Sequence, residues 1–363
     1  MTMPRMYRTS LVVTAALVLA AGILSGQQSV FSPGGTLPLL DAYLEPLRLQ
    51  AGIPGMSAAV LSDGELVWEK GYGFQNVATR ERPTADTPYL VGDMSSTLAA
   101  VLLLQCVQER RVGLDEPFSR YGLAAPEPEA TLRGILSHAP PPSAREPFIY
   151  SPERYETLTG LMEWCAPQPY RKSVAHRLLN RVAMRDSVPG TDLLNPEFSL
   201  PSDLFEGEDV ARYRTTLSRM AVPYKVTGRT KTERSEIPQI PLSASGGLVT
   251  TARDLARLDS WLDRRELLLD ETLAAAWRPV AERNGIASPM GLGWFVQYYR
   301  NERVVWHFGF VPNAYSSLIL KLPDRKLTFI VLANSDGLSA PYQLQAGDVT
   351  RSVFAALFLR LTT

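Results

Sequence analysis

Residues 89–107 read YLVGDMSSTLAAVLLLQCV, and they decide how the rest of the chain must be arranged. From Thr97 to Val107 nearly every residue is apolar or small, so a helix formed here would have no face suited to water. A helix that is hydrophobic all round is stable only when it is buried on every side. The sequence therefore predicts a central helix over this run, enclosed by the other elements of the fold.

The elements that enclose this helix begin with a hairpin. Met56 to Leu61 and Leu66 to Tyr72 are short apolar runs joined by Ser62-Asp63-Gly64-Glu65, and an Asp-Gly pair suits the tight turn of an antiparallel hairpin. Helical spacing predicts a first helix through Leu39 to Leu47 and a final amphipathic helix over about Ala346 to Leu361. The last third of the chain predicts further antiparallel strands at Trp294 to Tyr299, Val304 to Phe308, Tyr315 to Lys321 and Leu327 to Ala333.

The middle third, about 114–262, carries helical patches and most of the prolines but no strand-like alternation, which predicts a helical subdomain with long loops. The chain is therefore expected to have an α+β fold, with an antiparallel sheet flanked by helices. Residues 29–363 should form one domain, in which the helical subdomain is inserted between the two halves of the sheet.

Composition limits the classes of function. The 363 residues are 45% hydrophobic and 20% charged, which suits a large globular core and not a disordered chain. Lysine plus arginine number 37, as do aspartate plus glutamate, so no summed positive field exists to attract phosphate backbones. Nucleic acid is not expected as a partner.

The N-terminus has the layout of an export signal. Arg5 and Arg8 precede an uncharged run from Leu11 to Leu24, which small and polar residues follow. The run is shorter than the roughly 20 apolar residues that span a bilayer. Ala20-Ala21-Gly22 and Ser25-Gly26 make two competing, mediocre cleavage sites. Residues 1–28 are thus expected to be a signal peptide or a retained anchor. The domain is expected outside the cytoplasmic membrane, periplasmic or extracellular, with membrane contact only through this segment.

The cysteines and histidines carry little chemistry at the sequence level. Cys106 and Cys165 each lie in an apolar helical stretch, and two buried thiols are preferred here over a single bridge. His138, His176 and His307 are far apart, with no paired cysteine or carboxylate pattern around them. No metal site and no cofactor are expected.

Residues 89–97 resemble the segment that opens the central helix of class C β-lactamases, DD-peptidases and related esterases, where it carries a Ser-x-x-Lys motif. The resemblance covers about residues 37–358 and implies a β-lactamase/transpeptidase-like fold. Further similar stretches follow in the family's order: Gly113-Leu114-Asp115-Glu116-Pro117, Leu136-Ser137-His138, Phe148-Ile149-Tyr150-Ser151, residues 246–255, Gly291-Leu292-Gly293-Trp294 and His307-Phe308-Gly309.

The residues that carry the family's chemistry are altered. In such enzymes a serine at the helix start attacks the substrate, a lysine one turn later and a tyrosine act as the base, and backbone amides hold the oxyanion. By the resemblance, Asp93 stands at the serine position and Ser96 at the lysine position. No lysine lies between Lys70 and Lys172, so a shifted register cannot restore the motif.

Other motif positions are partly retained. The resemblance implies that Tyr150 and His307 keep catalytic-motif positions, while Pro152 replaces the amide side chain of a Tyr-x-Asn motif. It also implies a substrate cleft lined by Pro152, Gly309 and Phe310. Gly309 would let a ligand approach the strand backbone, and Phe310 and Pro152 are large enough to fill the cleft.

Each of these residues also has a structural interpretation. Asp93 is best explained as the N-cap of the central helix, with an aspartyl nucleophile as the alternative. Ser96 lies on the same helical face and can be drawn as an Asp93-assisted nucleophile. Tyr150 is equally well a half-buried aromatic, and His307 a structural histidine. A basic run is expected to be a solvated hairpin or loop, with an anion-binding cleft as the alternative; it comprises Lys225, Arg229, Lys231 and Arg234.

Loss of both nucleophile and base removes most of the rate of such a site, because these groups act as a unit. The sequence is therefore expected to encode a catalytically inactive, β-lactamase-related binding or scaffold protein. Its ligand would be a small molecule or, by analogy, a peptidoglycan peptide, and its partner another protein. The alternative is a serine hydrolase of esterase, β-lactamase or peptidase type with a rearranged active site.

Overall fold

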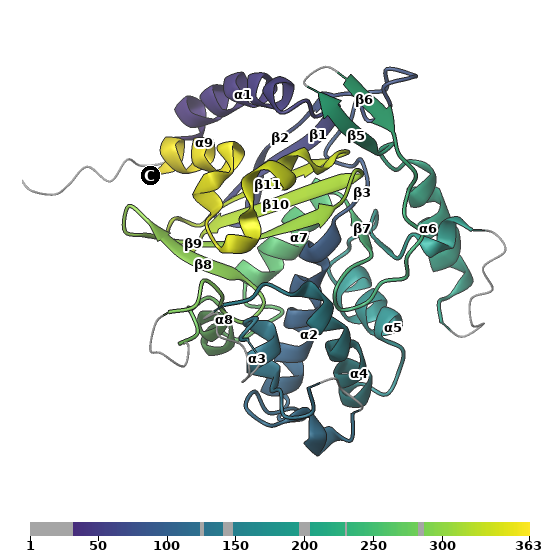
Figure 1. The fold of residues 1–363 in the computed structure, drawn as a ribbon, viewed down its shortest axis with the longest axis vertical. Helices are drawn as coiled ribbons and strands as arrows, with labels where there is room; N and C mark the ends of the chain where they lie inside the picture. The colour runs from purple at the N-terminus through teal and green to yellow at the C-terminus, as the bar shows by residue number, and fades with distance from the viewer. Residues whose placement is uncertain (1–31, 124–126, 141–147, 196–203, 229–230, 282–286) are drawn as a thin grey trace, which may run out of the picture.

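The protein is built on one six-stranded antiparallel sheet with helices on both faces (Figure 1). The computed structural model describes residues 32–123, 127–140, 148–195, 204–228, 231–281 and 287–363. The sheet has the strand order β2-β1-β11-β10-β9-β8. Its strands are β1 (Gly55–Ser62), β2 (Glu65–Gly73), β8 (Phe295–Tyr299), β9 (Glu302–Val311), β10 (Tyr315–Leu322) and β11 (Leu327–Ala333). The predicted α+β fold and its strands are confirmed.

The N-terminal hairpin joins the C-terminal strands, as the sequence predicted. Asp63 and Gly64 have φ values of 53° and 76°, the left-handed pair that a two-residue turn between twisted strands requires. β1 then pairs along its length with β11, from Met56 opposite Ala333 to Ser62 opposite Leu327. The first and last parts of the chain therefore close one sheet.

Two layers of helices cover the sheet. α1 (Pro33–Gln50) and α9 (Val353–Thr362) lie on one face, and α2 (Ser96–Gln108) and α7 (Ala252–Asp263) on the other. The predicted central helix is α2, in which every residue from Ser96 to Cys106 is buried. All of β11 is buried too, because both of its faces are covered.

The middle of the chain forms the predicted helical region, together with small β elements, of which the sequence indicated only the basic hairpin. A three-stranded sheet has the order β3-β7-β4, and β5 and β6 form a separate hairpin. The hairpin exposes Lys225, Lys231 and Arg234, which confirms the solvated hairpin for these residues; Arg229 lies outside the described residues. The remaining elements are β3 (Tyr89–Leu90), α3 (Leu132–Leu136), α4 (Glu156–Cys165), α5 (Tyr170–Val174), β4 (Val188–Pro189), α6 (Gly207–Ser218), β5 (Tyr224–Gly228), β6 (Lys231–Arg234), β7 (Leu248–Thr250) and α8 (Asp270–Ala276).

The last helix begins later than predicted. Ser352 accepts a hydrogen bond from the Ala355 amide and caps α9, which starts at Val353 and not near Ala346. Gln343 and Gly347 have φ values of 49° and 84°, so the chain before the cap forms short 3-10 turns that a continuous helix cannot cross.

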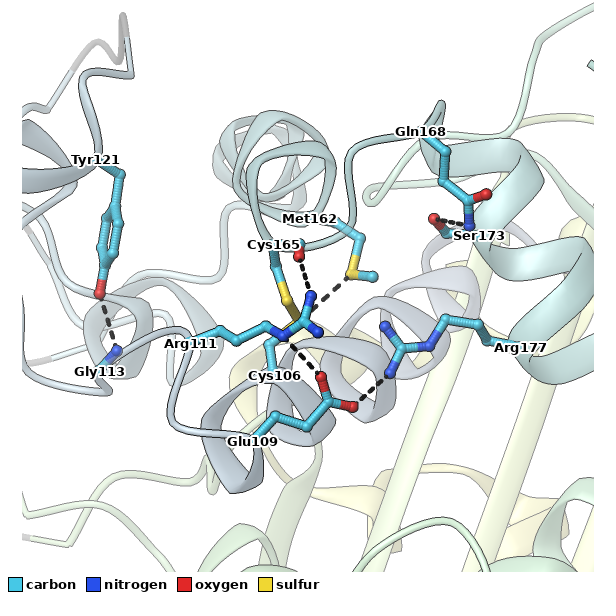
Figure 2. Close-up of a disulfide and its surroundings, with 10 residues drawn as sticks. All are labelled: Cys106, Glu109, Arg111, Gly113, Tyr121, Met162, Cys165, Gln168, Ser173 and Arg177. Atoms are coloured by element: carbon cyan, nitrogen blue, oxygen red, sulfur yellow. Dashed lines mark hydrogen bonds and ion pairs between the residues drawn. A yellow bond between two sulfur atoms is a disulfide. The ribbon is translucent and has the colours of Figure 1, made fainter.

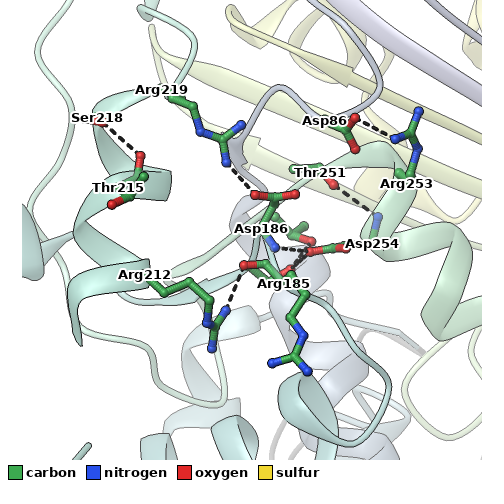
Figure 3. Close-up of polar contacts among 12 residues, drawn as sticks. Asp86, Arg185, Asp186, Arg212, Thr215, Ser218, Arg219, Thr251, Arg253 and Asp254 are labelled. Atoms are coloured by element: carbon green, nitrogen blue, oxygen red, sulfur yellow. Dashed lines mark hydrogen bonds and ion pairs between the residues drawn. The ribbon is translucent and has the colours of Figure 1, made fainter. Parts of the chain in front are cut away.

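Buried charges fix α7 to its surroundings. At its start, Thr251 accepts the Asp254 amide, while the buried Asp254 carboxylate accepts the Asp186 amide and the Ser187 hydroxyl, both at 2.8 Å (Figure 3). Near its end, Asp259 forms a 2.9 Å ion pair with Lys321 of β10, and both side chains are almost fully buried. Charges this deep persist only when paired, so α7 is held firmly against the sheet.

A disulfide joins Cys106 at the end of α2 to Cys165 at the end of α4 (Figure 2). The preferred interpretation of two separate buried thiols was therefore wrong. Arg111 donates to the Cys165 carbonyl oxygen at 2.9 Å and forms an ion pair with Glu109. These polar contacts lie next to the disulfide. The bond ties the central helix to the helical region across 59 residues of sequence.

The expected signal or anchor, residues 1–28, lies outside the described residues. Among the helices of the described part of the chain, none has both the length and the apolar composition that crossing a bilayer requires.

Replacing both cysteines, Cys106→Ala with Cys165→Ala, should lower the free energy of unfolding by about 2 to 4 kcal/mol, because the unfolded chain loses a cross-link that closes a long loop. Urea unfolding under non-reducing conditions measures this difference. Reductant should destabilise the parent protein and leave the double variant unchanged. A double variant within about 0.5 kcal/mol of the parent would show that the bridge contributes nothing to stability.

Candidate functional site

Asp93 and Tyr150 meet at the start of the central helix. Asp93 lies in a 3-10 turn, Gly92–Ser95, that leads directly into α2, and its side chain is partly exposed. The Tyr150 hydroxyl donates to Asp93 Oδ2 at 3.4 Å, although the two residues are 57 positions apart. The sequence placed these two side chains in one site, and the structure brings them into contact.

Asp93 does not act as the helix N-cap that the sequence suggested. The cap position of α2 is Ser95, and no side-chain cap bond is formed there or at the start of the 3-10 turn. Ser95 instead donates to the Gly92 carbonyl at 2.7 Å and accepts the Leu248 amide at 3.1 Å. The 3-10 turn moves the helix start three residues beyond Asp93 and leaves its carboxyl group directed at Tyr150.

The Asp93 carboxyl holds its proton unusually well. Burial raises its pKa from 3.8 to about 7, the hydrogen bond from Tyr150 lowers it, and the negative charge of Glu153 raises it. Burial also raises the pKa of Tyr150 well above its ordinary value, and the neighbouring Asp93 charge adds to this effect. Near neutral pH the pair therefore consists of a neutral phenol and a carboxyl group that is partly protonated.

Ser96 and His307 form a second pair, one turn further into the protein. Ser96 Oγ lies 3.3 Å from His307 Nε2, and the two residues are 2% and 0% exposed. His307 Nδ1 lies 2.7 Å from the Phe308 carbonyl oxygen, which can only accept, so this nitrogen carries the proton. Nε2 is then the acceptor, and the Ser96 hydroxyl donates to it.

This geometry resembles the contact between a nucleophile and its base, but the base is weak. Burial lowers the pKa of His307 to about 4, because charging the ring has no compensation from solvent. A general base acts best with a pKa near the working pH. His307 is thus neutral at pH 7, yet it has little affinity for the Ser96 proton.

Aromatic rings surround Tyr150 on several sides. Its ring centroid lies 4.5 Å from that of His138, 5.3 Å from Phe308 and 5.4 Å from Phe295. Phe295 is also 5.7 Å from the His307 ring, so it links the two polar pairs. The tyrosine hydroxyl can therefore move little, which makes it a fixed donor to Asp93.

His138 is a site residue that sequence reasoning missed in this role. Its Nδ1 accepts the Ser151 amide at 3.1 Å, and its ring stacks on Tyr155, so it holds the loop that carries Tyr150. Burial, followed by the nearby His307 and Arg154, lowers the pKa of His138 to about 3. Only its place among the family-like stretches marked it in the sequence. Glu153 was missed as well, since an exposed glutamate has no distinctive pattern.

Gly309 serves a different purpose from the one expected. A Cβ at Gly309 would lie 1.7 Å from the Val91 carbonyl oxygen, and one at Gly92 would lie 2.8 Å from the Phe310 amide nitrogen. The approach to the strand backbone is therefore made by the protein's own 3-10 turn and not by a ligand. Ser317 strengthens the contact by donating to the Val91 carbonyl at 2.9 Å.

Pro152 and Phe310 are the two remaining predicted cleft residues. Pro152 begins a 3-10 turn, Pro152–Tyr155, and has no amide that could hold a substrate carbonyl. Phe310 follows Gly309 on β9 and is 36% exposed, so it presents an apolar surface to solvent next to the glycine contact.

Residues 40–350 match the family described as Beta-lactamase. The Staphylococcus aureus (strain MW2) protein named Protein flp is 21% identical over 350 residues, which cover 83% of this chain and 64% of that protein. A D-aminopeptidase of Brucella canis is 25% identical over 176 residues, which cover 48% of this chain and 32% of that protein. The chain thus spans less than two thirds of the length of these relatives.

Solved structures show the same fold. An octameric penicillin-binding protein homologue from Pyrococcus abyssi superposes with a TM-score of 0.70 at 20% identity, covering 90% of this chain and 77% of that one. A D-amino acid amidase from Ochrobactrum anthropi SV3 gives a TM-score of 0.64 at 18% identity, covering 90% and 96% of the two chains. The family match extends over residues 40–350, most of the chain, and the chain therefore belongs to the β-lactamase family.

Proposed function

We propose that this chain is a non-catalytic member of the β-lactamase family that acts as a binding or scaffold protein. The observation that carries the proposal is the state of the nucleophile position. Asp93 stands where the family's serine would be, and its carboxyl group accepts a hydrogen bond from Tyr150. A carboxylate there would have to form a mixed anhydride, which an unactivated ester or amide does not favour.

The neighbouring serines do not replace the lost nucleophile. Ser95 is fully buried, with its hydroxyl bonded to the Gly92 carbonyl and its oxygen accepting the Leu248 amide. Ser96 is 2% exposed and faces the interior histidine. A nucleophile must come within about 3 Å of the carbon that it attacks. Because both serines are buried, a substrate cannot approach either hydroxyl this closely in the observed structure.

A second candidate function, hydrolysis by Ser96, rests on one specific observation. The Ser96 and His307 contact of 3.3 Å, with the ring oriented through Nδ1, is the arrangement of a serine and its general base. This candidate requires the buried pair to open to substrate, and it requires proton transfer to a histidine with a pKa of about 4. We therefore place it second.

The proposed site of action is outside the cytoplasmic membrane, where residues 1–28 would direct the chain as a signal or anchor. The disulfide between Cys106 and Cys165 supports this, since such bonds persist in oxidising compartments. The proposed ligand is a small molecule or a peptidoglycan peptide, by analogy with the family, and the proposed partner is another protein. Nucleic acid is not proposed, because the chain carries no net charge.

Incubation with a fluorescent penicillin and with a fluorophosphonate should leave the intact mass of the protein unchanged, because no accessible serine can be acylated. Mass spectrometry of the whole chain measures this directly. Ser96→Ala is the matched control, since any label on Ser96 must vanish in it. Stoichiometric labelling of the parent that the Ser96→Ala variant loses would establish the hydrolase and end the non-catalytic proposal.

The contribution of Asp93 to stability should fall as the pH rises from about 4 to about 7. The lowered pKa values of His138 and His307 act in the opposite direction, but they are common to the parent and to a variant at Asp93, so the difference between the two proteins isolates Asp93. The pKa of Asp93 is higher in the folded protein than in the unfolded chain, so the folded state binds more protons in this window. Asp93→Asn removes this titration and should make the protein more stable than the parent by about 1 to 2 kcal/mol at pH 8, with allowance for the partial exposure of the carboxyl group. The two should be nearly equal at pH 4. Urea unfolding across this pH range measures both curves.

Glu153→Gln provides the control for this pH experiment. Its carboxylate raises the pKa of Asp93, so the variant should keep the pH dependence but show it at lower pH. Parallel curves for the parent and Asp93→Asn would show that Asp93 titrates as in the unfolded chain.

A further inference from the structure

The outward side of α1 is apolar along most of its length. Between residues 38 and 50 the exposed positions are all uncharged, and Gln50 is the single polar one. The apolar residues, here called the α1 stripe, are Pro38, Leu39, Ala42, Tyr43, Pro46 and Leu49. Leu39, Tyr43 and Leu49 are each at least 50% exposed. A helix on the surface of a soluble domain normally turns charged side chains outward. An exposed apolar face of this kind is typical of a surface that contacts another molecule or a membrane.

The charges of α1 are placed so that they leave the stripe free. Asp41 is paired with Lys70 at 2.7 Å and accepts the Tyr72 hydroxyl, both from β2. Glu45 forms a two-pronged contact with Arg48, which is itself buried against the Ile53 carbonyl. Asp41 is therefore neutralised by β2, and Glu45, whose side chain is 42% exposed, is neutralised by Arg48 of its own helix.

α9 extends the apolar surface. It packs against α1 on the same face of the sheet (Figure 1). Its exposed Val353 and partly exposed Leu357 and Leu361 are spaced four residues apart and so share one side of the helix. Arg360 is exposed on the same helix and carries a positive charge. Apolar side chains bordered by a tyrosine and an arginine suit the boundary between lipid headgroups and acyl chains.

The sequence places this face next to a hydrophobic segment. Only residues 25–32 separate the uncharged run Leu11 to Leu24 from the start of α1 at Pro33. Eight residues span at most about 28 Å when fully extended. A chain that keeps its first 24 residues in a membrane must therefore hold α1 close to the surface of that membrane.

We propose that the α1 stripe rests on the lipid bilayer and orients the domain there. The proposal rests on the proposed export with a retained N-terminal segment. A second copy of the chain is a poorer fit, because the three large exposed side chains of the stripe offer roughly 300 Å² of apolar surface, whereas a stable dimer buries about 800 Å² per partner, of which about 450 to 500 Å² is apolar. The bilayer needs no such area, since the N-terminal segment supplies the affinity and the stripe only sets the orientation.

The test uses the full chain in vesicles of phosphatidylcholine and phosphatidylglycerol that contain a nitroxide-labelled lipid. An environment-sensitive dye is attached through Tyr43→Cys or, as the control, through Tyr298→Cys on the edge strand β8, where the tyrosine is 64% exposed. The native cysteines are buried in their disulfide and do not compete for the dye. Lipid quenching should be severalfold stronger at position 43 than at position 298. Equal quenching at the two positions would overturn the proposal.

A second set of variants separates orientation from simple tethering. In the protein labelled at position 43, Leu39→Glu with Leu49→Glu should reduce quenching to the level of the control position, whereas Gln50→Glu should leave it unchanged. A dye signal that depends on protein concentration in lipid-free detergent would assign the stripe to a second copy and overturn the proposal. The proposed export and non-catalytic role are tested independently, by the N-terminal mass of the mature chain and by acyl labelling.

Discussion

The architecture depends on the complete burial of α2. A helix without a polar side must be covered in every direction, and no single sheet or helix can do this. The sheet covers one side, and the helical region with α7 covers the others, so two halves of the chain that are distant in sequence close around one element. The disulfide fixes the far end of this helix, and the Val91–Gly92 contact with β9 fixes its beginning. The candidate site at Asp93 thus lies where the sheet and the helical region meet.

The sequence predicted those parts of the fold that are set by short-range pattern. The Asp63-Gly64 turn, the apolar strands and the helix from Thr97 each carry their signal within about ten residues, and all were found. The late start of α9 was missed because the helical spacing continues through Gly347, whose left-handed backbone interrupts it. The disulfide was missed for a different reason. A buried thiol and a buried half of a bridge have the same local sequence, and only the fold brings Cys106 to Cys165.

The candidate site could be located from the sequence but not understood from it. The order of the motifs predicted that Asp93, Ser96, Tyr150 and His307 lie in one site. Which of them contact each other depends on the three-dimensional structure, and the spacing of the residues in the sequence does not reveal it. The 3-10 turn delays the helix by three residues, so Asp93 turns to Tyr150 and Ser96 faces His307. Burial then sets the chemistry: it makes the carboxyl group more basic and the imidazole less basic, so both drift toward their neutral forms.

The contact between the 3-10 turn and β9 has a consequence for how such proteins are classified. At Gly309 and Gly92 the Cβ of any larger residue would collide with backbone atoms of the opposite segment, and at Gly92 the positive φ adds strain. A chain of this construction must therefore retain both glycines in order to fold, whatever has happened to its reactive groups. The glycine of a His-x-Gly motif is thus required by the packing of the fold. Its presence alone is therefore no evidence of catalytic activity.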